Sequence, residues 1–440
     1  MFAANVFPET ARVNQSGHLE VGGCDVPSLA AQFGTPLYVF DVQTLQNACR
    51  SYKAAFGAAY PGEVSVSYAC KAFLCFALAR VILAEGLGFD VVSIGELRAV
   101  LSAGAQAVDV HFHGNAKPRR ELEEALNLGV GRIVVDNLDE VSTLANLTAG
   151  RTTPQSLLVR LEPAVSAVTH ASIQTGQRGS KFGLPLEQLD ALATMVQAAS
   201  GVAIKGLHCH LGSQLFDVSA YERAIVVLLD AATHLRDKFG ISIEEISPGG
   251  GFAAAYLEEE GTPDVQRLAA VIGQALVRGC AERDLPLPRL IVEPGRSICA
   301  RAGVSVYEVI GTKPLERAEG RSAMRYVHVD GGMGDNPRPA LYDARYTAVL
   351  ANDLRAARVD TIHIAGRYCE SGDVLIRNAT FPREKIGDLV ALGGAGAYTL
   401  SLSSNYNMVP RPAVVFVADG MAQILQRRET FDDLFVRERL

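Results

Sequence analysis

One pattern recurs eight times between residues 64 and 296 of this 440-residue chain and limits the folds it can adopt. A short apolar run ends in polar or glycine residues, and a helical stretch with apolar residues at spacings of three and four follows. The runs are residues 64–68, 89–93, 109–113, 132–136, 156–161, 204–210, 244–247 and 290–293. Strands that alternate with helices predict parallel βα units, and eight units predict an α/β fold with a (β/α)8 TIM barrel. A doubly wound open sheet is the alternative.

The sequence pattern changes after residue 300. Short β-rich runs such as SVYEVIGT, MRYVHVDGG, DLVALGG and PAVVFVADG are punctuated by glycine and proline, without regular helices between them. This pattern predicts a C-terminal antiparallel β-sandwich or β-barrel domain over residues 301–440. Residues 1–36 are also β-like and are expected to pack with that domain, which leaves residues 37–300 for the barrel.

Composition excludes several classes of function. A hydrophobic fraction of 48% is enough for a large core, and a net charge of −7 gives no electrostatic reason to bind nucleic acid or an anionic membrane. The eight cysteines form no CxxC pair, so we expect reduced thiols and no metal site. The N-terminus lacks the pattern of a secretory signal, and no apolar run is long enough to span a bilayer. We therefore expect a cytoplasmic protein.

Residues with chemical potential lie at the ends of the predicted strands, where barrel enzymes place their active sites. Lys71 follows the first strand in apolar surroundings, which disfavour its charged form and make its amine a nucleophile; a surface lysine is the alternative. His210 closes the sixth strand and suits stacking on an aromatic ligand, while Ser213 suits donation to a phosphate. A structural histidine is the competing interpretation.

The last two strands end in further candidates. Gly249, Gly250 and Gly251 would let backbone N–H groups approach an anion, although a flexible turn explains them equally well. Glu293-Pro294-Gly295-Arg296 places an acid and a guanidinium at the same mouth, and the arginine suits phosphate or carboxylate. A structural salt bridge is the alternative there.

Together these motifs resemble the alanine-racemase-like, fold-type III pyridoxal-phosphate enzymes, and within them the diaminopimelate decarboxylase family. The general motifs are YACKAF, HCHLGSQ, SPGGGF and EPGR. The segments typical of the branch are THASIQTGQRGSKFG, DGGMGDNPRPALYDARY, GRYCESGD and GGAGAYTLSLSSNYN. The resemblance extends from GTPLYVFD near the N-terminus to NYNMVPRP, almost the whole chain.

The resemblance implies a role for each candidate. Lys71 would bind pyridoxal 5'-phosphate covalently, His210 would stack on its ring and Glu293 would face the ring nitrogen. The remaining cofactor contacts would come from Ser213, Gly249, Gly250, Gly251, Gly295, Arg296 and Tyr398. The substrate would be held by Arg296, Arg338, Tyr342, Glu370 and Tyr398, with Cys369 beside the reacting carbon. The family also implies an obligate homodimer in which the partner supplies the Cys369–Glu370 pair.

The implied reaction is decarboxylation of meso-2,6-diaminopimelate to L-lysine and CO₂, the last step of lysine biosynthesis. Glu293 favours decarboxylation, because a racemase of this fold class is expected to carry arginine at that position. Either Cys369 or Lys71 would reprotonate the reacting carbon. Arg338 or Arg296 would receive the distal carboxylate and Glu370 the distal ammonium, whereas an arginine paired within the protein is the alternative for Arg338.

Three rival functions follow from the same residues. A related decarboxylase would act on ornithine, arginine or a carrier-bound substrate, and an amino-acid racemase would invert a chiral centre without releasing CO₂. A non-catalytic pyridoxal-phosphate carrier would consist of a single barrel, whereas a β-rich domain is predicted here after the barrel.

Overall fold

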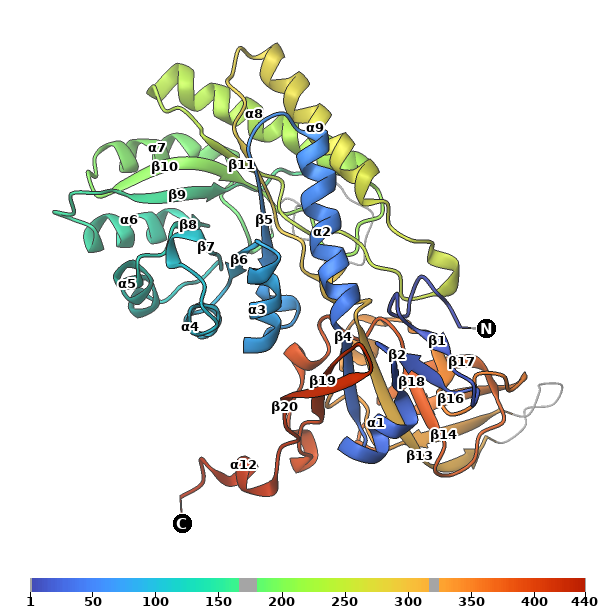
Figure 1. The fold of residues 1–440 in the computed structure, drawn as a ribbon. Helices are drawn as coiled ribbons and strands as arrows, with labels where there is room; N and C mark the ends of the chain where they lie inside the picture. The colour runs from blue at the N-terminus through green and yellow to red at the C-terminus, as the bar shows by residue number, and fades with distance from the viewer. Residues whose placement is uncertain (1, 166–179, 316–323, 440) are drawn as a thin grey trace. The chain divides into compact units, whose positions relative to one another are not determined.

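The computed structural model describes residues 2–165, 180–315 and 324–439, which form two compact units (Figure 1). One unit comprises residues 49–253 and 263–295, and the other comprises residues 1–48, 254–262 and 296–440. No helix in these three stretches is both long and apolar enough to cross a membrane.

The first unit contains a closed barrel of eight parallel strands surrounded by helices (Figure 1). The strands are β5 (Val64–Ala69), β6 (Gly88–Val91), β7 (Val110–Phe112), β8 (Arg132–Val135), β9 (Gln155–Arg160), β10 (Val202–His208), β11 (Glu245–Ser247) and β12 (Arg289–Val292). The pairing of Leu290 with Val64 joins β12 to β5 and closes the ring. The predicted barrel is therefore confirmed, and the open sheet is excluded.

Each barrel helix buries one face, as its apolar spacing predicts. The helices are α2 (Val42–Ala59), α3 (Phe76–Ala84), α4 (Ile94–Ser102), α5 (Arg119–Leu128), α6 (Leu138–Leu147), α7 (Leu189–Gln197), α8 (Ser219–Phe239) and α9 (Val265–Glu282). Local chemistry sets several of their ends. Ser93 and Asn137 accept hydrogen bonds from the amides of the first turns of α4 and α6, and Gly129 ends α5 in a left-handed conformation.

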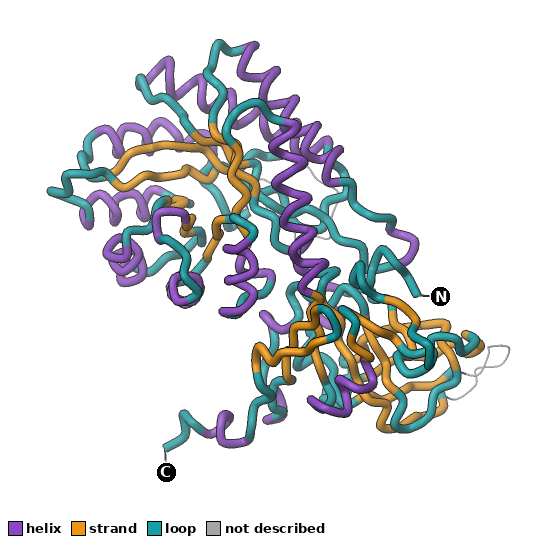
Figure 2. The backbone as a smooth tube through the Cα atoms, viewed as in Figure 1, coloured by secondary structure: helices purple, strands orange, loops and turns teal. Residues whose placement is uncertain are grey.

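The second unit is built on a mostly antiparallel sheet, and strands are orange in Figure 2. The order of the strands in this sheet is β17-β16-β14-β13-β4-β19-β20. Its strands are β4 (Leu37–Asp41), β13 (Gly303–Pro314), β14 (Arg325–Val329), β15 (Ala348–Leu350), β16 (Arg358–Ala365), β17 (Val374–Pro382), β18 (Leu389–Leu392), β19 (Ala413–Ala418) and β20 (Met421–Gln426). The pairs β14–β16 and β19–β4 are parallel. The predicted C-terminal β domain is thus confirmed.

The N-terminal segment shares the core of this β domain. It forms β1 (Arg12–Val13), β2 (Leu19–Val21), β3 (Cys24–Asp25) and α1 (Val26–Phe33). Phe7 and Leu19 lie in one buried apolar cluster with Val304 and Val415, from strands β13 and β19. Three short helices complete the unit: α10 (Arg296–Cys299), α11 (Arg338–Tyr342) and α12 (Phe431–Phe435).

Candidate active site

The carboxyl ends of the barrel strands surround a cavity of about 520 Å³. Lys71 lies in the turn after β5, His210 two residues after β10 and Glu293 directly after β12, and all three line the cavity. Parallel strands end at one rim of a barrel, which is why residues distant in sequence meet there. His113 and Arg160 line the same cavity, and neither was singled out in the sequence.

Glu293 is a buried carboxylate held by three side chains. Its two oxygens lie 3.0 Å from His208 Nε2 and 2.8 Å from Ser247 Oγ, which donates, and His113 Nε2 lies 3.6 Å away. Burial raises the pKa of this carboxyl, but the two histidines and the hydrogen bonds from His208 and Ser247 outweigh burial and hold the pKa well below its usual value. Glu293 is therefore ionised at neutral pH.

His210 is a neutral imidazole. Burial, reinforced by the positive charges of Lys71 and Arg160, lowers its pKa well below the usual value. The N–H of Gly250 donates to its Nδ1 over 3.3 Å, so the proton of the neutral ring lies on Nε2. A neutral, oriented ring suits stacking against a flat ligand.

The three glycines after β11 are required by close backbone packing. A Cβ at Gly249, Gly250 or Gly251 would lie 2.4, 2.0 or 2.1 Å from a carbonyl oxygen, and Gly249 and Gly251 have φ of +78° and +88°. The N–H of Gly249 donates to Ser247 Oγ and that of Gly250 to His210, so two of the three amides are engaged within the barrel. Their predicted role as a phosphate cradle stays a prediction.

Two more predicted residues, Ser213 and Gly295, lie near these barrel turns. Ser213 is half-buried and precedes the bridge between Leu215 and Phe252. Gly295 packs on the turn that carries Lys71, because a Cβ there would lie 2.9 Å from the carbonyl oxygen of Ala69.

Asp90 adds a second buried acid behind the cavity lining. Burial raises its pKa to about 8, with a further contribution from Glu293 and an opposing one from Lys71. Ligand atoms of His111, His113 and Glu293 lie within 4.8 Å of one another, a spacing that a metal ion can bridge. Since Glu293 already accepts bonds from its neighbours, this trio is best explained as part of the polar network that fixes that carboxylate.

The β domain gathers a second set of predicted residues around two arginines. Arg338 Nη1 donates to Tyr346 Oη over 2.6 Å, and its guanidinium lies 4.3 Å from the ring centroid of Tyr256. Arg296 Nη1 donates to Tyr256 Oη over 2.7 Å and its guanidinium lies 4.6 Å from the ring centroid of Tyr398. Both arginines are buried, and Arg338 forms no ion pair with any carboxylate among the described residues.

Backbone strain marks the same cluster. Tyr398 has φ of +57°, a left-handed conformation that costs a bulky residue energy and is typical of functional sites. Tyr342, the last residue of α11, is half-buried. The structure therefore brings Arg296, Arg338 and Tyr398 together within the β domain.

Cys369 and Glu370 lie on an exposed turn of the β domain. The N–H of Cys369 donates to Asn407 Oδ1 over 3.1 Å, and Tyr406 Oη donates to Glu370 Oε1 over 2.6 Å. Cys369 is the one exposed thiol of the eight, all of which are free. Both side chains are thus open to a ligand or to another subunit.

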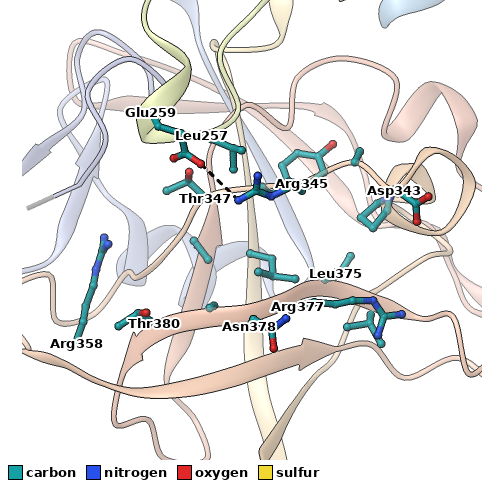
Figure 3. Close-up of a pocket in the computed structure, with 17 residues that line it drawn as sticks. Leu257, Glu259, Asp343, Arg345, Thr347, Arg358, Leu375, Arg377, Asn378 and Thr380 are labelled. Atoms are coloured by element: carbon teal, nitrogen blue, oxygen red, sulfur yellow. Dashed lines mark hydrogen bonds and ion pairs between the residues drawn. The ribbon is translucent and has the colours of Figure 1, made fainter. Parts of the chain in front are cut away.

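A wide cavity of about 680 Å³ in the β domain contains none of the predicted residues. It is lined by parts of β17 and of the segment after α11, and Figure 3 shows Arg345 paired with Glu259 on the side opposite β17. Volume alone therefore does not identify the site. The branch-typical segment THASIQTGQRGSKFG lies largely outside the described residues, which resume at Ser180.

Sequence reasoning did not single out five residues that the structure places in these clusters: Asp90, His113, Arg160, His208 and Tyr256. A signal exists for two of them, because His113 and His208 lie at strand ends of the same barrel rim. Tyr256 has no such signal, since it stands in an irregular loop.

Comparison with known proteins gives a consistent picture. Residues 42–300 match the family model described as the pyridoxal-binding domain of pyridoxal-dependent decarboxylases. The chain is 40% identical to the diaminopimelate decarboxylase of Synechocystis sp. over 98% of its length and 92% of that protein. It is 41% identical to the Bacillus subtilis enzyme, with 97% and 96% covered.

Solved structures agree with the sequence relatives. The structure of M. jannaschii diaminopimelate decarboxylase with L-lysine has a TM-score of 0.90 and 30% identity, with 98% of each chain covered. A lysine/ornithine decarboxylase from Vibrio vulnificus with cadaverine has a TM-score of 0.75 and 28% identity, with 90% of this chain and 96% of that chain covered.

Proposed function

The chain belongs to the diaminopimelate decarboxylase family of pyridoxal-dependent enzymes, and on this premise we propose how its residues share the work. It converts meso-2,6-diaminopimelate to L-lysine and CO₂ with pyridoxal 5'-phosphate as cofactor, the last step of lysine biosynthesis. The main support for this assignment of roles is the barrel cavity, which Lys71, a neutral His210 and an ionised, buried Glu293 line together.

These residues fit the cofactor. A lysine amine can bond to an aldehyde, and a neutral imidazole can stack on an aromatic ring. A buried carboxylate can accept a hydrogen bond from a protonated ring nitrogen. When bound, the cofactor acts as an electron sink for the negative charge left by the departing CO₂. We assign Lys71, His210 and Glu293 to these three contacts. We assign Ser213 with Gly249–Gly251, Gly295, Arg296 and Tyr398 to the remainder of the cofactor site.

Glu293 keeps its charge because the protein has already oriented its neighbours. His208 and Ser247 occupy one lone pair on each carboxylate oxygen, so the side chain cannot rotate to another partner. A fixed negative charge facing a ring nitrogen favours protonation of that nitrogen. Such preorganised electrostatic groups supply much of an enzyme's rate enhancement.

Arg338 is the proposed receptor for the distal carboxylate. A buried guanidinium is costly unless it is paired, and within the described chain this one contacts tyrosines rather than acids. A substrate carboxylate would supply the missing negative charge in a bidentate geometry. Arg296, Tyr342 and Tyr398 are proposed to line the same substrate site, and Glu370 is proposed to receive the distal ammonium.

Reprotonation of the reacting carbon is assigned to Cys369 or Lys71. Cys369 and Glu370 are exposed in the single chain, which supports a homodimer in which each subunit supplies this pair to its partner. We also propose that residues 37–300, where the family match lies, contain the cofactor domain, and that residues 301–440 form the β domain together with residues 1–36. Within 37–300, residues 37–48, 254–262 and 296–300 pack as part of the β unit instead. Eight free thiols, seven of them buried, support a cytoplasmic location.

The test is incubation of the purified protein with pyridoxal phosphate and meso-diaminopimelate, with CO₂ and L-lysine both measured and Lys71→Ala as control. We expect stoichiometric lysine from the wild type and none from the variant. A protein that binds the cofactor, shown by its absorbance, but yields no lysine would contradict the substrate assignment. Ornithine and arginine assays would then follow.

A further inference from the structure

We propose that Tyr256 is a positioning residue that presents Arg296 and Arg338 as one receptor for the distal carboxylate of the substrate. The inference rests on the proposed function and adds a specificity determinant to it. Tyr256 itself need not touch the substrate, because its effect passes through the two guanidinium groups.

Tyr256 contacts both arginines. Its hydroxyl accepts a hydrogen bond from Arg296 Nη1 over 2.7 Å, while its ring lies 4.3 Å from the guanidinium carbon of Arg338. Tyr346 contacts Arg338 and packs edge-on against Tyr256, with ring centroids 5.4 Å apart. One phenol therefore fixes the direction of one arginine and the plane of the other.

The physical need for such a residue follows from charge. Two guanidinium groups that must approach one carboxylate repel each other, and burial strengthens that repulsion. The negative face of an aromatic ring attracts a cation without neutralising its charge. A carboxylate in this position would instead form an ion pair and compete with the substrate. A tyrosine thus holds the arginines in place and leaves their charge available.

Tyr256 lies in a loop that leaves the barrel sequence to pack with the β domain. Residues 254–262 stand between barrel residues in the sequence, yet they pack as part of the β domain. Ala255 lies in the apolar core of that domain, and Asn5 Nδ2 donates to the carbonyl oxygen of Leu257 over 3.1 Å.

Tyr256 itself is anchored on both sides of its backbone. Thr347 Oγ1 donates to its carbonyl oxygen over 2.9 Å, and its N–H donates to Glu260 Oε2 over 2.7 Å. A loop tied down at several points places its side chain reproducibly, as a positioning role requires.

Two variants separate the hydroxyl from the ring. Tyr256→Phe removes the acceptor for Arg296 and keeps the ring under Arg338, whereas Tyr256→Leu removes both. The probes are L-lysine and cadaverine, which differ only by the carboxylate that the arginines are proposed to bind. Inhibition constants for both are measured on the cofactor-loaded enzyme, together with KM and kcat for meso-diaminopimelate.

We expect the inhibition constant of L-lysine to rise about tenfold in Tyr256→Phe and further in Tyr256→Leu, since a misplaced guanidinium loses a charged hydrogen bond. The constant for cadaverine should stay within about twofold, and KM should change more than kcat. Tyr60→Phe is the matched control, because it removes another buried hydroxyl, bonded to the carbonyl oxygen of Pro288. It should leave the ratio of the two constants unchanged.

Equal changes for L-lysine and cadaverine, or no change for either, would overturn the proposal. Should Tyr256→Leu fail to fold, the Phe variant decides alone. The wild type separates this inference from the proposed function. If the wild type makes no lysine, the substrate assignment fails; if it does and Tyr256→Phe binds L-lysine normally, only the role of Tyr256 fails.

Discussion

Two buried charges of the proposed active site, Glu293 in the barrel and Arg338 in the β domain, are held in opposite ways. In the barrel, Glu293 is matched by His208 and Ser247, and Lys117 is paired with Glu140. In the β domain, Arg338 lies against Tyr256 and Tyr346 and is not paired with a described acid.

This difference indicates which ligand each region serves. A group that is already satisfied keeps its charge and position throughout a reaction cycle, which suits contact with a cofactor that stays bound. A cation held by aromatic rings is not neutralised by an acid of the protein, so it can pair with an anionic substrate that enters and leaves. Variants can test each half of this comparison.

The largest effect is expected in the barrel. Glu293→Gln keeps the shape of the side chain and removes its charge, so kcat should fall by at least about 100-fold, or roughly 3 kcal/mol. The lowered pKa of Glu293 also means that its ionisation stabilises the fold above the ordinary pKa near 4.5. That stabilisation is lost as the pH falls through the lower folded-state pKa, and the Gln variant should not show this loss.

The matched control is Glu245→Gln. Glu245 is also buried in the barrel, but it pairs with Arg132 at the start of β11, away from the strand ends that line the cavity. Glu245→Gln should lower the melting temperature and leave kcat within about threefold. Residues at the amino-terminal end of barrel strands usually contribute to stability rather than to catalysis. A wild-type kcat in Glu293→Gln would show that the charge of Glu293 does not serve the cofactor.

The next effect is expected in the β domain. Arg338→Met should lower kcat/KM for meso-diaminopimelate about 100-fold, or roughly 3 kcal/mol, mainly through KM, because a charged bidentate contact is lost. Its melting temperature should change less than that of Arg325→Met, which breaks ion pairs with Glu384 and Asp360. An unchanged KM would show that Arg338 does not receive the carboxylate.

The sequence predicts the barrel well because its signal is local. The run 132–136 was predicted as a strand, and β8 spans Arg132–Val135. The order of the β-domain sheet has no such signal. Strand β4 lies between β13 and β19, so residues 37–41 pair with residues 303–306 and 413–417. Periodicity describes which face of a strand is buried, not which distant strand lies beside it.

The candidate site divides in the same way. Lys71, His210 and Glu293 could be predicted to meet because all three follow parallel strands of one barrel. His208 also lies at a strand end of this rim, but it was not predicted to support Glu293, because the sequence pattern does not show which side chains of the rim bond to one another. Tyr256 could not be predicted either, because only the three-dimensional structure shows that its loop leaves the barrel sequence to join the β domain.

A third effect concerns the pH dependence of barrel stability. Burial raises the pKa of Asp90 from 3.8 to about 8, so its protonated form stabilises the fold fully below pH 3.8 and this contribution is lost as the pH rises through about 8. Asp90→Asn removes this titration. In the cofactor-free protein, the free energy of unfolding of the wild type should fall by at most about 1.4 kcal/mol per pH unit over that range, and that of the variant should not. Melting temperatures at pH 5, 7 and 9 test this, with exposed Asp109→Asn as control. Parallel curves for wild type and Asp90→Asn would refute it.

The smallest effect tests the exposed turn of the β domain. Tyr406→Phe removes the hydroxyl that donates to Glu370, which leaves the carboxylate in place but free to rotate. An exposed hydrogen bond contributes about 1 kcal/mol or less, so KM should rise about threefold to fivefold with little change in kcat or melting temperature. Phe431→Tyr, at another exposed aromatic position of the β domain, should change neither. A KM equal to that of the wild type would mean that Glu370 is oriented by other groups, such as those of a partner subunit.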